Sequence, residues 1–246
     1  MKDGKRCTAI VLCAGSGSRM KSSVAKQYMD LAGHPVIRYP LRAIEESAVI
    51  DDCILVAGQN DLEFVREEIV RGYGFSKVDR VIAGGAERYL SVWEALQVIA
   101  AGDMRVPNRD GFVFIHDGAR PFLTEELLGR LGDEVARYHA CVAAVPSKDT
   151  IKITDEEGFA VRTPDRRNVR NVQTPQVFDT ELILEAYGRL ARNLDSVRER
   201  GIAVTDDASV VELFTDRRVR MTEGDYRNIK ITTPEDLAVA EAMLKL

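Results

Sequence analysis

The chain has 246 residues, with 34 Lys or Arg against 39 Asp or Glu, giving a formal charge of −5. Apolar residues form 45% of it, enough to build a core and to argue against intrinsic disorder. No apolar run approaches the roughly 20 residues that cross a bilayer, and the mildly acidic total argues against a nonspecific nucleic-acid coat. We therefore expect a soluble, cytoplasmic protein with one domain over residues 1–246, without nucleic-acid or membrane partners.

The cysteines are far apart in the sequence, and each lies in an apolar segment. They are Cys7, Cys13, Cys53 and Cys141. Because no Cys-x-x-Cys pair is present, the sequence predicts neither a zinc site nor a disulfide framework. We expect buried, reduced thiols.

Apolar segments of strand length alternate with segments of helical periodicity as far as residue 145. The expected strands are 8–14, 53–57, 78–83, 112–116 and 140–145, and the expected helices between them are 35–46, 61–71, 86–101 and 125–138. This alternation predicts an α/β, Rossmann-like fold with a mostly parallel twisted sheet and helices on both faces.

The pattern then changes to a two-residue alternation. Residues 150–154 and 159–163 flank a turn at 155–158, which predicts a β-hairpin. An isolated two-stranded hairpin is marginally stable, so we expect a protruding arm, inserted at about 148–172, that packs on a second copy of the chain in a homodimer. Helices are expected at 179–192, 207–213 and 233–246, and a short strand at 219–222.

A glycine-rich segment follows the first expected strand. It reads Ala14-Gly15-Ser16-Gly17-Ser18-Arg19-Met20 and leads to Lys26. Small residues let backbone N–H groups approach an anion, and Arg19 and Lys26 add positive charge. The segment predicts a triphosphate-binding loop; an ordinary β-to-α turn with solvated basic side chains is the alternative.

Two other phosphate-binding patterns do not match. A P-loop ATPase needs Gly-Lys-Ser/Thr at the end of the loop, which is absent. A nicotinamide-dependent dehydrogenase needs a third glycine where Met20 stands, and an acid after the second strand, where the chain has Gly58-Gln59-Asn60. Both classes are therefore disfavoured.

Further polar residues follow other expected strands. Asp117 should emerge at the carboxyl edge of the sheet, near Mg²⁺ or a substrate hydroxyl, and Arg120 is suited to a phosphate; alternatively, these two residues cap a turn and pair with each other. Gly85 and Ser91 are placed to read a base edge, although helix capping explains them about as well. Lys230, in an apolar stretch, needs a phosphate or an acidic partner.

Together these motifs resemble those of the 2-C-methyl-D-erythritol 4-phosphate cytidylyltransferases. The resemblance extends from Thr8 to about Leu244 and includes Thr174-Pro175-Gln176, Thr205-Asp206-Asp207-Ala208-Ser209 and Asn228-Ile229-Lys230. It implies a nucleotidyltransferase of the non-mevalonate isoprenoid pathway, which joins CTP to the phosphate of methylerythritol phosphate and releases pyrophosphate. It also implies Mg²⁺ held mainly by the CTP phosphates, with no protein metal ligand assigned.

The resemblance assigns roles by position. Catalysis would use Arg19, Lys26, Arg166 and Lys230. The nucleotide would be bound by Cys13, Ala14, Gly15, Ser16, Gly17, Arg19, Lys26, Gly85, Ser91 and Asp117, and the polyol phosphate by Asp117, Arg120, Thr150, Arg166, Thr205 and Lys230. Thr150 and Arg166 would reach from the arm into the neighbouring subunit's site.

The sequence departs from the family pattern at Cys13, Ala25 and Ala86, where relatives often have alanine, proline and an acid. Ala86 leaves a contact to the base unassigned. A ribitol 5-phosphate cytidylyltransferase shares the loop, the aspartate motif and the arm, and is the nearest alternative. A nucleotide-binding regulatory protein without activity is the alternative from another class.

Overall fold

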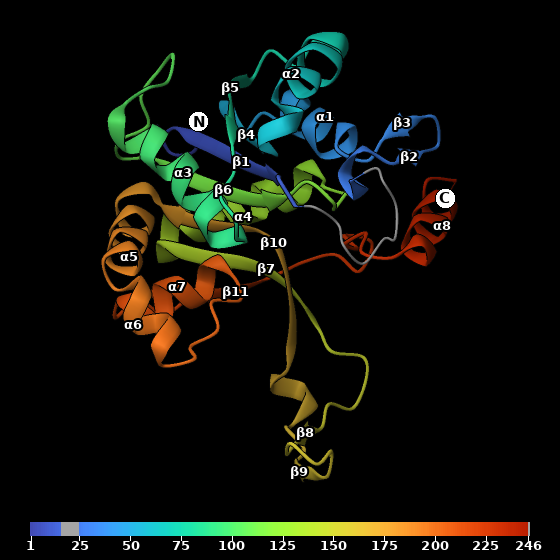
Figure 1. Cartoon of the computed structure of the whole chain (residues 1–246), viewed down its shortest axis with the longest axis vertical. Coiled ribbons are helices and arrows are strands. Elements are labelled where there is room, and N and C mark those ends of the chain that lie inside the picture. The colour runs from blue at the N-terminus through green and yellow to red at the C-terminus, as the bar shows by residue number, and fades with distance from the viewer. Residues whose placement is uncertain (16–24, 246) are drawn as a thin grey trace.

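The computed structural model describes residues 1–15 and 25–245 and is built on a seven-stranded sheet (Figure 1). Its strand order is β11-β7-β10-β6-β1-β4-β5. The strands are β1 (Cys7–Cys13), β4 (Asp52–Ala57), β5 (Val78–Ala83), β6 (Phe112–Asp117), β7 (Ala140–Pro146), β10 (Arg170–Asp179) and β11 (Arg220–Glu223). Within this sheet β10 runs antiparallel to β6 and β7, and the other paired strands are parallel. The predicted mostly parallel α/β fold is confirmed.

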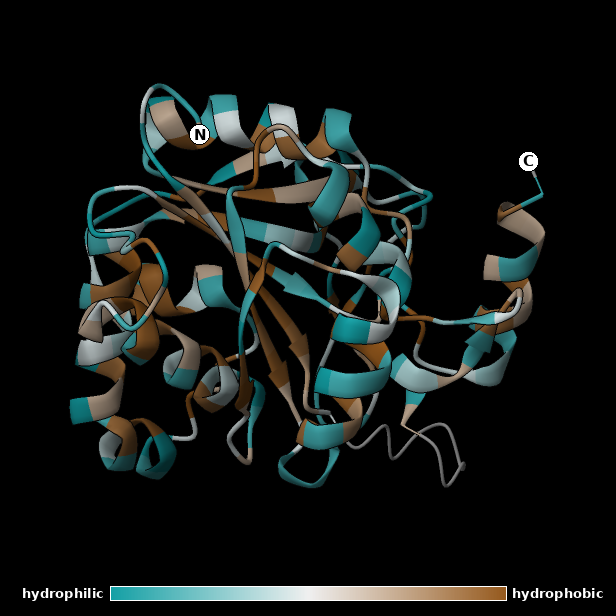
Figure 2. Ribbon diagram, turned by 90° about the horizontal axis from the view of Figure 1, so that it is seen from above, coloured by the Kyte–Doolittle hydropathy of each residue, from teal (hydrophilic) through white to brown (hydrophobic). Residues whose placement is uncertain are grey.

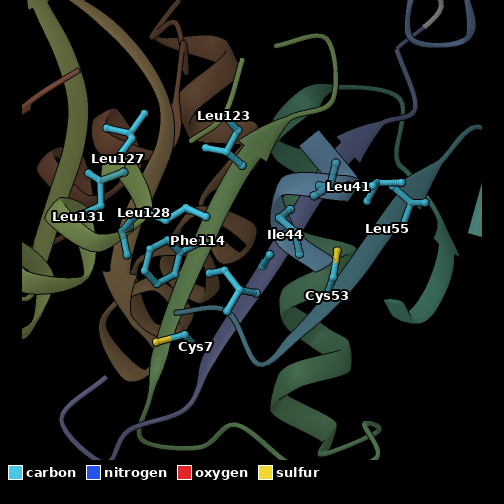
Figure 3. Packing of buried hydrophobic residues seen from close by; sticks show 14 of the residues in the cluster. Cys7, Leu41, Ile44, Cys53, Leu55, Phe114, Leu123, Leu127, Leu128 and Leu131 are labelled. Carbon is cyan, nitrogen blue, oxygen red and sulfur yellow. The ribbon is translucent and has the colours of Figure 1, made fainter. Parts of the chain in front are cut away.

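Helices cover both faces of the sheet, whose central strands are hydrophobic (Figure 2). One face packs against α1 (Arg38–Glu46), α4 (Glu125–Tyr138) and the π-helical η4 (Val65–Arg71). Leu41, Phe114 and Leu128 belong to this core (Figure 3). The other face packs against α3 (Arg88–Ala101), α5 (Thr180–Arg192) and α7 (Asp207–Phe214). Burial of β1 and β6 on both faces explains their continuous apolar sequences.

The register of β1 brings the carboxyl ends of its neighbours together. Leu12 pairs with Asp117 of β6, and Cys13 pairs with Ala57 of β4. Gly84 follows β5 and donates its N–H to Ala57 O at 2.8 Å. The segments that follow β1, β5 and β6 therefore meet at one edge of the sheet, where open α/β folds bind ligands.

Several predicted elements differ from the observed ones. Residues 61–71 do not form a single α-helix, because the short α2 (Leu62–Phe64) continues as the π-helix η4. The strand β10 and the helix α6 (Leu194–Glu199) were not predicted. The last helix, α8 (Pro234–Met243), is shorter than the expected range 233–246, and its N-cap is Thr233.

The arm lies far from the sheet (Figure 1). Its strands β8 (Ile153–Thr154) and β9 (Ala160–Arg162) pair antiparallel, so the predicted hairpin is confirmed, although both strands are shorter than expected. The 3₁₀ turn η5 (Arg166–Asn168) follows. Phe159 and Val161 are 68% and 63% exposed. The apolar side chains of the arm therefore lack cover from their own chain.

The remaining elements are the hairpin β2 (Asp30–Leu31) and β3 (His34–Pro35) and the 3₁₀ turns η2 (Lys26–Tyr28) and η3 (Gln59–Asp61).

A third, smaller hydrophobic cluster packs against the C-terminal segment. Leu31 and Val36 pack with Ile231 and with Ala240 of α8. Ile231 also donates its N–H to Ala119 O at 2.8 Å. These contacts fix the segment that carries Lys230.

The cysteines are free and buried, as predicted. Burial raises the pKa of the Cys13 thiol to about 12, so it stays protonated at neutral pH.

In the part of the chain that the structure describes, no helix has the length and apolar character needed to cross a membrane.

Candidate active site

A cavity of about 450 Å³ opens at the carboxyl ends of β1 and β6. Its walls come from the start of the glycine-rich loop, η2, the paired glycines, the start of α3, the end of β6 and the segment before α8. The residues lining it include Cys13, Ala14, Gly15, Lys26, Gln27, Gly85, Arg88, Ser91, Asp117 and Lys230. The structure therefore brings together most of the residues predicted to contact the nucleotide.

The two described ends of the glycine-rich loop are joined by Gln27. This buried side chain donates from Nε2 to Cys13 O at 2.5 Å and to Gly15 O at 3.1 Å. Gln27 thus holds Lys26 beside the start of the loop, and both line the cavity. The predicted residues Ser16, Gly17 and Arg19 lie outside the described residues.

The paired glycines form a wall with no room for side chains. A Cβ atom on Gly84 would lie 2.5 Å from Ala14 Cβ and 2.6 Å from Ser91 Oγ. A Cβ atom on Gly85 would lie 2.4 Å from Leu90 Cβ. Ser91 is buried and donates its hydroxyl to Glu87 O at 3.2 Å. Glycine is required here by close packing between α3 and the loop after β1.

Asp117 sits at the cavity between two cations. Its Oδ2 is 2.7 Å from Lys230 Nζ, and its Oδ1 is 3.2 Å from Arg88 Nε. Burial alone would raise the pKa of Asp117, but the charges of Arg88 and Lys230 hold it well below the usual range. Asp117 is therefore ionised at neutral pH.

Arg88 is a residue of the site to which the sequence analysis gave no role. Its Nη1 and Nη2 donate to the two carboxylate oxygens of Asp207 at 2.9 and 2.7 Å. Burial alone would lower the pKa of Arg88, but Asp207 and Asp117 raise it. A cation in the first turn of a helix opposes the helix dipole. The position of Arg88, three residues after Gly85 and in the first turn of the helix predicted over residues 86–101, was thus a signal that it has acidic partners.

The turn after β6 is fixed by a chain of hydrogen bonds. The Asp117 N–H donates to Thr174 Oγ1 at 3.1 Å, and the Thr174 hydroxyl donates to His116 Nδ1 at 3.0 Å, because the proton of the neutral ring is on Nε2. His116 Nε2 then donates to Arg120 O at 3.2 Å. Burial lowers the pKa of His116 from 6.5 to about 4, so the ring is neutral at pH 7.

Arg120 does not form the ion pair with Asp117 that was the alternative prediction. Its Nη1 donates to Asn228 O at 2.7 Å, its buried Nε has no hydrogen-bond partner among residues 1–15 and 25–245, and burial lowers its pKa. Asp117 instead pairs with Arg88 and Lys230, because both approach the two oxygens directly. The turn itself is present: the Arg120 N–H donates to Asp117 O at 3.0 Å.

Among the residues that the structure describes, four predicted site residues do not line this cavity: Arg120, Thr150, Arg166 and Thr205. Thr150 and Arg166 are exposed on the arm, and Arg166 Nη1 donates to Lys148 O at 3.2 Å. Thr205 is exposed just before α7, two residues ahead of Asp207. Within a single chain the cavity therefore lacks the residues that were expected from a second subunit.

A metal ion held by the protein does not fit these residues. Within residues 1–15 and 25–245, no group of three or more His, Cys, Asp or Glu side chains is placed to hold one. Both oxygens of Asp117 already contact cations.

The sequence and the fold both match known proteins. The model of the family described as IspD, 2-C-methyl-D-erythritol 4-phosphate cytidylyltransferase, matches residues 7–246. A protein of that name from Lachnospira eligens is 46% identical over 97% of this chain and 99% of its own length. One from Lachnoclostridium phytofermentans is 45% identical over 98% and 97%. The crystal structure of 4-diphosphocytidyl-2C-methyl-D-erythritol synthase from Anaerococcus prevotii has a TM-score of 0.82 and 34% identity, covering 99% of this chain and 100% of that one.

Proposed function

Because this chain belongs to the 2-C-methyl-D-erythritol 4-phosphate cytidylyltransferase family, we propose that it transfers CMP from CTP to 2-C-methyl-D-erythritol 4-phosphate. The products are the CDP-linked methylerythritol and pyrophosphate, in the non-mevalonate isoprenoid pathway. The observation that supports this reaction most strongly is the cavity, where Lys26 and Lys230 meet the loop after β1. Fixed cations beside small residues suit a reaction between two phosphates.

The nucleotide is proposed to lie between the loop and the paired glycines. Gly85 and Ser91 line the wall where the cytosine would be recognised, and Gly15 and Lys26 lie where the triphosphate would bind. Backbone groups can approach a base closely at Gly85 because no side chain intervenes. The roles of Ser16, Gly17 and Arg19 in binding the triphosphate rest on the family resemblance.

The chemical step joins two anions. A phosphate oxygen of the acceptor attacks the α-phosphorus of CTP, a new P–O bond forms, and the bond from the α-phosphorus to the bridging oxygen breaks, releasing pyrophosphate. Repulsion between the acceptor phosphate and the α-phosphate dominates the barrier. Lys26 would stabilise charge on the α-phosphate, and Lys230 would hold the acceptor phosphate. No covalent intermediate with the protein is required.

Mg²⁺ is proposed to enter as part of the nucleotide substrate, bound by the CTP phosphates. This follows from the donor set, since the described residues offer no site with several metal ligands. Arg120 and Thr205 are proposed to contact the acceptor. The buried Nε of Arg120, which has no hydrogen-bond partner in the described part of the chain, is a donor beside the Asp117 turn.

The arm is proposed to complete the site of a second copy in a homodimer. Its apolar side chains are exposed, among them Phe159 and Val161, and an isolated hairpin gains stability by packing on another surface. Thr150 and Arg166 would then reach the partner's cavity. The reduced, buried cysteines suit a cytoplasmic enzyme.

Pyrophosphate release tests the proposal. The purified protein is incubated with Mg²⁺, each of the four nucleoside triphosphates, and either methylerythritol phosphate or ribitol 5-phosphate. We expect release with CTP and methylerythritol phosphate only. Faster release with ribitol 5-phosphate would identify the alternative acceptor, and CTP binding without release from either acceptor would indicate a regulatory nucleotide-binding protein.

A further inference from the structure

The Arg88 guanidinium lies between two carboxylates that belong to different elements. Asp207, in the first turn of α7, is fully buried and accepts two hydrogen bonds from Arg88, at 2.9 and 2.7 Å. Asp117, at the end of β6, accepts from Arg88 Nε at 3.2 Å. A planar guanidinium that contacts both carboxylates fixes the end of β6 relative to α7.

The second oxygen of Asp117 is bound by Lys230. The Lys230 ammonium lies 2.7 Å from Oδ2, while Arg88 occupies Oδ1. Rotation of the Asp117 carboxylate would therefore break one contact or the other. The place of the Lys230 ammonium at the cavity thus depends on Arg88, acting through Asp117.

A further contact anchors the Asp207 carboxylate, at the same oxygen that Arg88 Nη1 contacts. The buried Tyr187 hydroxyl donates to Asp207 Oδ1 at 2.6 Å. The carboxylate that holds Arg88 is therefore itself held by α5. The network pairs two cations, Arg88 and Lys230, with two anions, Asp117 and Asp207.

We propose that Arg88 is a positioning residue for the transfer reaction: anchored on Asp207, it orients Asp117 and thereby holds the Lys230 ammonium at the reacting phosphates. This inference rests on the proposed function. The competing explanation is structural, namely that Arg88 only neutralises the buried charge of Asp207. An unpaired buried carboxylate is strongly destabilising, so that explanation predicts a loss of folding stability alone.

A pair of substitutions separates the two explanations. Arg88→Met leaves Asp207 buried without a counter-charge, and we expect its thermal unfolding temperature to fall. Adding Asp207→Asn removes the second charge while keeping an acceptor for Tyr187, and we expect the unfolding temperature to recover. Pyrophosphate release then gives kcat, and the KM for CTP, in a folded protein that lacks the Arg88 contact to Asp117.

For the double variant we expect kcat about 10²-fold below wild type, the order of loss when a reacting group is misplaced by about 1 Å. The KM for CTP should change far less, because the proposed contact of Lys230 is with the acceptor phosphate. Arg88→Lys keeps the charge beside Asp207 but cannot contact both carboxylates in a planar fork. We expect it to unfold near the wild-type temperature and to lose kcat.

The matched control removes an ion pair of the same kind from an exposed site. Arg42 and Glu46 pair at 2.7 Å on the surface of α1, and Arg42→Met with Glu46→Gln should leave kcat unchanged. Wild-type kcat in a stably folded Arg88→Met/Asp207→Asn or Arg88→Lys protein would overturn the positioning role. Absence of pyrophosphate release by the wild-type protein would instead refute the proposed function.

Discussion

The buried His116 should make the stability of the protein depend on pH. The ring is 1% exposed, and burial disfavours its charged form. Nδ1 accepts from the Thr174 hydroxyl, and Nε2 donates to Arg120 O. A second proton on Nδ1 would place the charge of an imidazolium in this buried position, away from water. We therefore predict that acid destabilises the protein through His116.

The sign and size of this effect follow from the pKa values of His116 in the unfolded and the folded protein. Burial lowers the pKa of His116 from 6.5 to about 4 in the folded protein. Between these values the unfolded chain binds more protons, so the free energy of unfolding falls as the pH falls. The contribution of His116 is fully present above pH 6.5, and its loss at pH 4 is about 3 kcal/mol.

Urea denaturation from pH 7 to pH 4 measures this loss. His116→Gln keeps a donor toward Arg120 O and has no titrating ring, so its free energy of unfolding should decline by about 3 kcal/mol less than that of the wild type. His34→Gln, at a half-buried site on β3, serves as the control and should follow the wild type. Equal declines for wild type and His116→Gln would refute the argument that His116 is held neutral.

Other predictions concern the loop, the wall and the arm. Lys26→Ala should keep the wild-type unfolding transition and lower kcat by about 10²- to 10³-fold; near-normal turnover would remove Lys26 from the mechanism. Gly84→Ala puts a Cβ 2.5 Å from Ala14 Cβ, so the free energy of unfolding measured in urea should fall by about 1–3 kcal/mol. An unchanged free energy of unfolding would show that the neighbouring residues can shift to accommodate the Cβ. Phe159→Asp should turn a dimer into a monomer in sedimentation experiments, and a monomeric wild type would contradict the proposed role of the arm.

The parts of the fold that were predicted correctly have simple burial patterns. Residues 78–83 and 125–138 form β5 and α4 at the predicted bounds. The strand β10 was missed because it contains Pro175 and buried polar residues such as Gln173 and Gln176. These side chains are satisfied by partners distant in sequence, so no local alternation marks the strand.

A site residue could be predicted from the sequence where its own surroundings showed that it needs a charged partner. A lysine in an apolar stretch implied a charged partner, and the structure places Lys230 against Asp117. Arg88 was missed because its partners, Asp117 and Asp207, are far away in sequence. Thr150 and Arg166 were assigned to a second subunit's site from the family resemblance, and within one chain both side chains are exposed on the arm.

The central claim is that fixed cations around one cavity bring two phosphates into contact. Its most direct test is a crystal structure of the protein with CTP and Mg²⁺. The account predicts the α-phosphate beside Lys26, with the cytosine against Gly85 and Ser91 and the Lys230 ammonium on the open side of that phosphate. A nucleotide bound elsewhere, or bound here with Lys26 and Lys230 directed away from the α-phosphate, would contradict it.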